Sequence, residues 1–142
     1  LYDLMVIMSF SIALPMTFLS DWLVELLYGK EFMYSGKVLS VHIWAGIFVF
    51  LGVSRGGWIV TENLQKYTAV YLGIGMIANI ILNVLLIPDM GILGAAYATL
   101  FSQMISVLIA PALIKETRIS FYMMLKSLSF YSIIRSVLKK VN

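Results

Sequence analysis

Apolar residues dominate four long stretches of the chain, which run from about residue 4 to 20, 37 to 60, 67 to 87 and 92 to 114. Each stretch is close to the roughly 17 to 25 residues that a helix needs to cross the hydrocarbon core of a bilayer. Backbone amides and carbonyls must pair within such a segment, because lipid offers them no partner, so each stretch is predicted to be helical. The pattern predicts an all-α integral membrane helical bundle with about four transmembrane helices.

The connections between these helices differ in length and character. "TENLQK" and "PDMG" are short, which is typical of links between antiparallel neighbours. The first connection, "DWLVELLYGKEFMYSG", carries Trp22 and Tyr28, which suit headgroup depth, a start cap at Ser20 or Asp21, and Gly29 to end a helix. Two interpretations stay open: a separate helix at the membrane interface, or a first helix that simply extends.

Composition supports a membrane protein. Hydrophobic residues make up 61% of the 142 residues and charged residues only 12%, against about 25% charged residues in soluble domains. Cysteine is absent, which excludes disulfides and thiolate metal sites, and no metal or cofactor site is predicted. The chain starts at Leu1 without the features of a signal peptide. We expect it to be the C-terminal piece of a longer chain.

The composition changes after the fourth apolar stretch, so residues 119–142 are predicted to form a basic cytoplasmic tail beyond a bundle of residues 1–118. From Ser129 onward, polar and basic residues fall on one arc of a helical wheel and apolar residues on the other. This pattern predicts an amphipathic helix lying in the membrane plane, with anionic membrane lipids as partners. Binding to a calmodulin-like protein or a partner helix uses the same pattern and stays open.

The distribution of cations predicts the orientation. Six of the ten Lys and Arg residues follow the last span: Lys115, Arg118, Lys126, Arg135, Lys139 and Lys140. Basic residues near span ends favour the cytoplasm, so the C-terminus is predicted to be cytoplasmic. Four crossings then place the N-terminus and "TENLQK" on the same side and the acidic connections outside. The cations form no patch interleaved with aromatics, so no nucleic-acid partner is predicted.

Two stripes of small and polar residues mark the third and fourth helices. On the third helix, Tyr71, Gly75, Asn79 and Asn83 recur every four residues. The fourth helix carries a stripe at spacings of three and four, consisting of Gly91, Ala95, Thr99, Ser102, Ser106 and Ala110. Such stripes favour close packing with interhelical hydrogen bonds, and the two asparagines are also candidates to line a substrate cavity. Pro15 and Pro111 are predicted to kink or loosen their helices.

The stretch that spans both helices, "NIILNVLLIPDMGILGAAYATL", resembles the recurrent Asn, Ile-Pro, Gly, Gly-Ala-Ala, Thr pattern of polysaccharide biosynthesis proteins, the O-antigen flippases of the Wzx type. Their superfamily also holds MATE transporters and lipid II flippases. "LLYGKEF" resembles the outer loop of the same family. The resemblance covers about residues 1 to 118 and fits the C-terminal transmembrane bundle of such a carrier.

The resemblance implies a transporter of undecaprenyl-pyrophosphate-linked oligosaccharide in the bacterial cytoplasmic membrane, working by alternating access. It also implies a partner, the N-terminal bundle of the same full-length chain. A MATE-like drug or cation antiporter is the first alternative, although such a carrier is expected to hold a membrane-embedded acid, and the four spans show none. A structural membrane subunit is the second alternative.

Five residues are candidates for the site. Arg55 in "GVSRGGWIV" is a candidate to grip the pyrophosphate, since arginine binds phosphate with paired hydrogen bonds, or to snorkel to the cytoplasmic interface. Gln103 is a candidate for sugar hydroxyls, together with Asn79 and Asn83, although packing is the alternative for all three. His42, the single histidine, is a candidate for proton coupling or for a simple hydrogen bond between helices.

An enzyme is not expected. An intramembrane protease or acyltransferase needs a nucleophile with a base, or paired carboxylates, within the spans. The acidic residues lie in loops or at span ends, and "GVSRGG" lacks the spacing of a nucleophile elbow.

Overall fold

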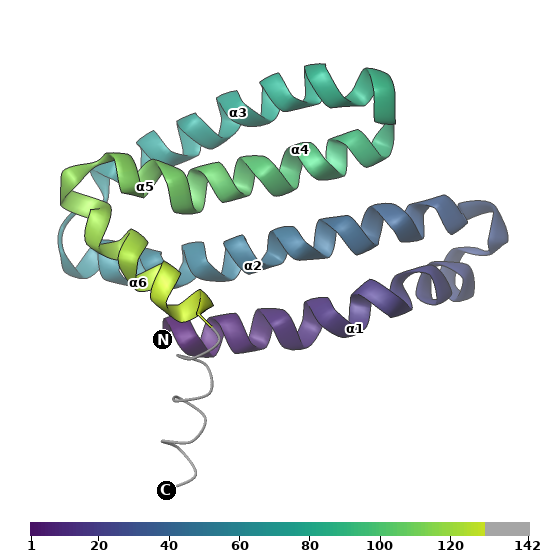
Figure 1. Ribbon diagram of the computed structural model, residues 1–142, viewed down its shortest axis with the longest axis horizontal. Coiled ribbons are helices and arrows are strands. Elements are labelled where there is room, and N and C mark those ends of the chain that lie inside the picture. Colours follow the sequence, from purple (N-terminus) through teal and green to yellow (C-terminus); the bar gives the residue numbers. More distant parts are fainter. Residues whose placement is uncertain (130–142) are drawn as a thin grey trace, which may run out of the picture.

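The computed structural model describes residues 1–129 as a series of helices (Figure 1). Four elements make up most of the chain: α1 (Tyr2–Tyr28), α2 (Met33–Thr61), α3 (Lys66–Met90) and α4 (Ile92–Met104). Helix α4 continues as a π-helix, η2 (Ile105–Ile109), and then as α5 (Ala110–Leu113). Short 3-10 turns, η1 (Lys30–Phe32) and η3 (Lys115–Thr117), precede α2 and the last helix, α6 (Arg118–Leu128).

Four helices are long and apolar enough to cross a membrane: Tyr2–Tyr28, Lys30–Thr61, Lys66–Met90 and Ile92–Leu113. This confirms the predicted all-α fold with four membrane-spanning segments. Their outer surfaces carry large apolar side chains in the open, such as Phe18, which is 83% exposed, and Val84, which is 69% exposed. Soluble proteins rarely expose continuous apolar surface, so these faces suit lipid.

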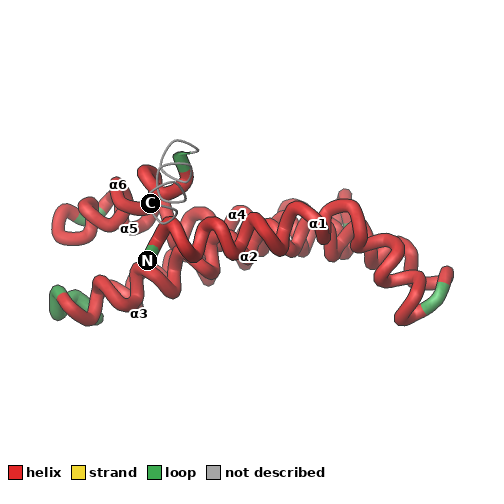
Figure 2. Tube along the Cα trace, turned by 90° about the horizontal axis from the view of Figure 1, so that it is seen from below, coloured by secondary structure: helices red, strands yellow, loops and turns green. Residues whose placement is uncertain are grey.

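The four spans form a single layer in the order α1, α2, α4, α3 (Figures 1 and 2). Helix α4 packs between α2 and α3, so the prediction that consecutive helices are packed side by side is wrong for α2 and α3. The buried residues of α4 are small, namely Gly94, Ala96, Ala98 and Ser102, which lets the helix approach a neighbour on either side. The short link between α2 and α3 holds together only their ends.

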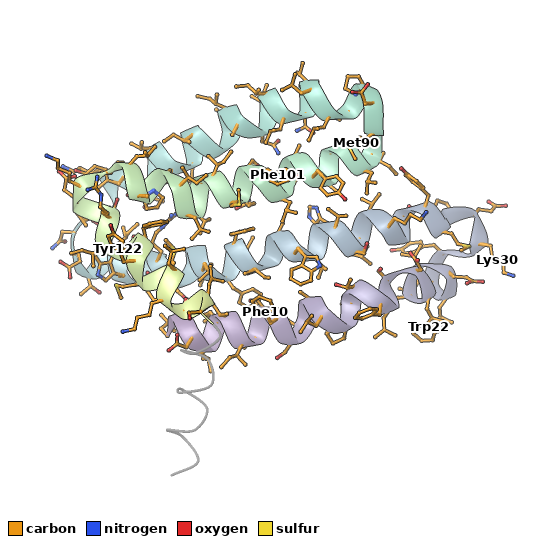
Figure 3. All side chains as sticks on the ribbon, in the orientation of Figure 1. Phe10, Trp22, Lys30, Met90, Phe101 and Tyr122 are labelled. Carbon is orange, nitrogen blue, oxygen red and sulfur yellow. The ribbon has the colours of Figure 1, made fainter. Side chains whose placement is uncertain are left out.

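The first connection shows that α1 is one continuous helix to Tyr28. The extended helix is therefore the correct interpretation, and the separate interfacial helix is wrong, because Ser20 and Asp21 lie inside α1 and cap nothing. Gly29, with a φ of 90°, ends the helix as predicted, and its amide donates to the Glu25 carbonyl. Trp22, Lys30 and Met90 all lie toward this end of the layer (Figure 3).

The turn between α3 and α4 is tighter than predicted. Pro88 and Asp89 continue α3 to Met90, so Gly91 alone separates the two helices. Gly91 has φ 57° and ψ −136°, a backbone conformation that a residue with a Cβ rarely adopts. Its amide donates to the Ile87 carbonyl, which closes the last turn of α3. The glycine in "PDMG" is therefore the residue that reverses the chain.

The buried core is small and gathers toward the end of the layer where the chain begins. One cluster joins α1, α2, η2 and α6 and consists of Tyr2, Val6, Ile47, Leu51, Val107 and Met124. A second cluster joins Ile59, Tyr71 and Ala110. Phe10 packs edge-on against Trp44 between α1 and α2, with 5.9 Å between the ring centroids (Figure 3). The first cluster anchors α6 to the spans through Met124. The amphipathic helix predicted from Ser129 onward falls almost entirely outside the described residues.

Candidate functional site

The two predicted stripes face each other across the contact of α3 with α4. Asn79 donates from Nδ2 to Ser102 Oγ at 3.2 Å, and Ser106 Oγ donates to the Tyr71 carbonyl at 2.9 Å. A Cβ placed on Gly75 would lie 2.7 Å from Ser106 Cβ, so glycine is what allows the two backbones to come this close. The stripes therefore build the helix contact from which the candidate site is formed.

Two grooves open along α4. The first, of about 320 Å³, lies between α3 and α4 and is lined by Leu72, Gly75, Met76, Asn79, Thr99, Ser102, Gln103 and Ser106. The second, of about 240 Å³, lies between α2 and α4 and is lined by Leu39, His42, Ile43, Ala45, Gly46, Val49, Thr99 and Gln103. Thr99 and Gln103 border both grooves, so the two hollows are neighbours on one face of the layer.

Three of the five predicted site residues meet at these grooves: His42, Asn79 and Gln103. Asn79 is near the middle of α3, and Gln103 is near the middle of the span Ile92–Leu113. Within residues 1–129, no hydrogen bond joins the side chain of His42 or Gln103 to another residue. An amide and an imidazole at membrane depth need a polar partner, because lipid cannot supply one. The hydrogen-bonding groups of these two side chains can therefore bind water, a ligand or another helix.

Asn83, the fourth predicted residue, hydrogen-bonds to Asn79. Its Nδ2 donates to both the backbone carbonyl and the Oδ1 atom of Asn79, each at 2.9 Å. The Asn79 side chain is thus held from both sides, since its own Nδ2 donates across to Ser102. Asn83 does not line either groove, and its hydrogen bond to Oδ1 orients the side chain of Asn79.

Arg55, the fifth predicted residue, is buried away from both grooves and only 6% exposed. One terminal nitrogen, Nη1, donates to the carbonyls of Val107 at 2.9 Å and Ser106 at 3.2 Å. The guanidinium also lies over the Tyr71 ring, 4.6 Å from its centroid, in a cation–π contact. In this arrangement Arg55 neither extends to the interface nor presents its charge to the groove face.

The reason for this position is Pro111. In an α-helix the amide of residue 111 would bond to the Val107 carbonyl, and in a π-helix it would bond to the Ser106 carbonyl. Proline has no amide hydrogen, and its ring pushes on the preceding turn. The chain widens into the π-helix η2 just before Pro111, as the loosening predicted for this residue implies. Arg55 thus donates hydrogen bonds to the two carbonyls for which Pro111 provides no amide donor.

Tyr71, which the sequence pattern marks only as part of a packing stripe, connects Arg55 to Thr117 at the start of the last helix. It is fully buried, its hydroxyl pairs with the Thr117 hydroxyl, its backbone carbonyl accepts from Ser106, and its ring faces Arg55. The sequence gives only a partial signal: Pro111 leaves carbonyls unpaired within an apolar span, and Arg55 is a cation deep within another. That the two residues meet beside Tyr71 depends on how α2 packs against η2, which the sequence pattern does not give.

The described chain offers little to a metal ion: residues 1–129 contain no group of three or more His, Asp or Glu side chains placed to hold one. The chain matches no family model, no curated protein and no solved structure.

Proposed function

We propose that this chain is part of a multi-pass membrane transporter that moves lipid-linked oligosaccharide, of the undecaprenyl-pyrophosphate type, across the bacterial cytoplasmic membrane. The observation that carries the proposal is the pair of grooves near the middle of the spans, where the side chains of His42 and Gln103 have no hydrogen-bond partner within the described chain. Sites near the middle of the bilayer, lined by polar groups, are typical of carriers. The resemblance of residues 79–100 to oligosaccharide flippases gives the substrate class.

The chemistry of the groove face suits sugars. Asn79 and Gln103 offer amides, and Thr99 and Ser102 offer hydroxyls, all uncharged groups that exchange hydrogen bonds with sugar hydroxyls. Neither groove is bordered by an acidic residue. A drug or cation antiporter is expected to bind its cation with such an acid, so the oligosaccharide carrier is the better match for this part of the protein.

The pyrophosphate needs a different partner. Neither groove is bordered by Lys or Arg, and Arg55 is occupied with the carbonyls of η2. We therefore propose that Arg55 acts as a positioning residue for the Ser106 wall of the groove. The cations that meet the pyrophosphate would come from the N-terminal bundle proposed to share the site.

That second bundle also accounts for the open face of the layer. A single row of four helices cannot enclose an aqueous path, and the unpartnered polar groups of His42 and Gln103 lie on the face that carries both grooves. Two bundles that rock about such a face would expose it alternately to either side of the membrane. In this scheme we propose a proton-coupling role for His42, which borders the second groove.

The test is rescue of surface glycan in a strain that lacks its own oligosaccharide carrier, with the glycan signal divided by the amount of inserted protein. Gln103→Leu and His42→Leu remove the unpaired polar groups without reducing bulk, and both are expected to lower rescue. Ile80→Leu is the matched control, because Ile80 is 57% exposed and does not border the grooves.

The alternatives predict other results. A structural membrane subunit would show unchanged glycan per inserted protein in both groove variants. A MATE-like antiporter would instead change the sensitivity of the cells to cationic drugs while leaving glycan untouched. Equal rescue by Gln103→Leu, His42→Leu and the parent would exclude the proposed role of the groove.

A further inference from the structure

Helix α6 has an inverted distribution of polar and apolar side chains. Its buried residues are Ser120, Met124 and Ser127, and the two serines bond to their own helix, donating to the carbonyls of Thr117 and Met124. Its exposed side is largely apolar, with Ile119 and Tyr122 each 61% exposed, and it continues through Met123 and Leu125. A helix bathed in water would place these residues the other way round.

The same side of α6 also carries positive charge. Arg118 and Lys126 are exposed at its two ends, and Lys115 is exposed in the turn before it. Arg118 also donates from Nε to the Ala112 carbonyl, which ties the start of α6 to the end of the last span. A helix with a mixed apolar and basic outer face is typical of elements that lie in the headgroup region of a membrane.

The position of α6 agrees with that environment. The helix turns away from the direction of the four spans and runs obliquely across α2 to the start of α1 (Figure 1). It is held there by Met124, which is fully buried in the cluster with Tyr2 and Val6, and by the pairing of Thr117 with Tyr71. The outer face, where Tyr122 lies, is therefore presented at the end of the spans (Figure 3).

We infer that the outer face of α6 docks on the surface of an anionic phospholipid membrane, with Ile119, Tyr122 and Leu125 entering the acyl boundary and Lys115, Arg118 and Lys126 meeting the headgroups. The inference depends on packing and charge alone and stands independently of the proposed transport function. It concerns α6 itself, in addition to the lipid partners predicted for the tail after Ser129.

The absence of cysteine from the chain allows a clean test with single labels. Tyr122→Cys carries a fluorophore on the outer face of α6, and Gln65→Cys carries the same fluorophore in the exposed turn between α2 and α3 at the same end of the layer. The chain is reconstituted in phosphatidylcholine vesicles with or without phosphatidylglycerol. Quenching is measured with nitroxide lipids of each headgroup and with a water-soluble quencher.

We expect the label at position 122 to be quenched by nitroxide lipids and shielded from the aqueous quencher, while the label at position 65 behaves in the opposite way. Nitroxide phosphatidylglycerol should quench position 122 more than nitroxide phosphatidylcholine. One cation near an anionic surface is worth up to about fivefold in binding, so Lys115→Gln/Lys126→Gln should lower this preference severalfold. High salt should lower it as well.

Lys30→Gln/Lys37→Gln is the matched control, since it removes two cations from the opposite end of the layer, and it should leave the preference at position 122 unchanged. Access of the aqueous quencher to position 122 would overturn the inference. Shielding from both quenchers would also overturn it and would indicate a protein partner or a second copy of the chain. Equal quenching by the two lipids would refute the role of the headgroup charge.

Discussion

Arg55 on α2 donates hydrogen bonds to the Ser106 and Val107 carbonyls, the two that Pro111 leaves without an amide donor. Arginine and proline, 56 positions apart in the sequence, thus form a compensating pair. Each would be unfavourable alone: the proline would leave backbone carbonyls unpaired, and the arginine would be a buried charge without acceptors. Together they stabilise a π-helix beside the groove.

The first prediction is that these two residues are energetically coupled. Arg55→Met should lower the free energy of unfolding by about 1 to 3 kcal/mol, because it leaves the η2 carbonyls without a donor. In a Pro111→Ala background the restored amide can take up one of those carbonyls, so the same substitution should cost less. Unfolding of the purified protein in mixed micelles measures both penalties, and identical penalties in the two backgrounds would rule out the coupling.

A second prediction concerns the close approach of α3 and α4. Gly75→Ala should lower the free energy of unfolding by roughly 1 to 3 kcal/mol, because its Cβ would lie 2.7 Å from Ser106 Cβ. Gly73→Ala is the control on the same helix: a Cβ there meets nothing within 4 Å, so it should be neutral or slightly stabilising. Adding Ser106→Gly to Gly75→Ala should recover part of the loss. If alanine is tolerated equally at positions 73 and 75, the contact is assigned to the wrong face.

A third prediction is that alanine substitutions at Asn79 and Asn83 lower the free energy of unfolding by different amounts. Asn79→Ala breaks the bond to Ser102 on the neighbouring helix and should cost about 0.6 to 1.7 kcal/mol, the range of interhelical hydrogen bonds in membranes. Asn83→Ala breaks bonds within α3 alone and should cost less. In a double-mutant cycle, Ser102→Ala should add little to Asn79→Ala. Full additivity of those two substitutions would mean that the two side chains do not interact.

The fourth prediction is the orientation. The start of α1, the turn between α2 and α3 and helix α6 lie at one end of the layer, with the turn between α3 and α4 at the other (Figure 1). If the cation-rich end is cytoplasmic, Asp89→Cys should react in intact cells with an impermeant thiol reagent, whereas Glu62→Cys should react only after the membrane is opened. Both positions are exposed, so burial does not confound the comparison. Labelling of Glu62→Cys alone would reverse the topology.

The number and type of the spans follow from the sequence because a run of apolar residues has few ways to satisfy its backbone in lipid. The order of the helices in the layer does not follow, since links such as Glu62 to Gln65 restrain only helix ends, and the small faces of α4 decide its neighbours. The groove residues, too, are predicted by the sequence in part only. Asn79 and Gln103 stand out as amides in apolar runs, yet the meeting of His42 with Gln103 requires knowing that α4 lies beside α2.

The contacts around Tyr71 and Pro111 could not be predicted from the sequence. The sequence shows that a proline loosens a helix, but the donor that repairs the break comes from whichever helix happens to pack there. That information lies in the arrangement of α2 against η2, which no local pattern contains. Arg55 stands out in the sequence as a cation within an apolar run, and its surroundings, with two carbonyls and an aromatic ring, give it a packing role within the described chain.

The position of α4 between α2 and α3 has a consequence for how the protein is made. A ribosome delivers α1 and α2 first, and these can pair at once as a hairpin. Helix α3 follows, but its packing partner α4 has not yet been synthesised, so α3 has no helix to pack against along its length. Insertion of α4 between α2 and α3 then joins the early hairpin to α3. A nascent chain arrested after Met90 would therefore contain a paired α1 and α2, with α3 tethered to α2 at one end and without its packing partner.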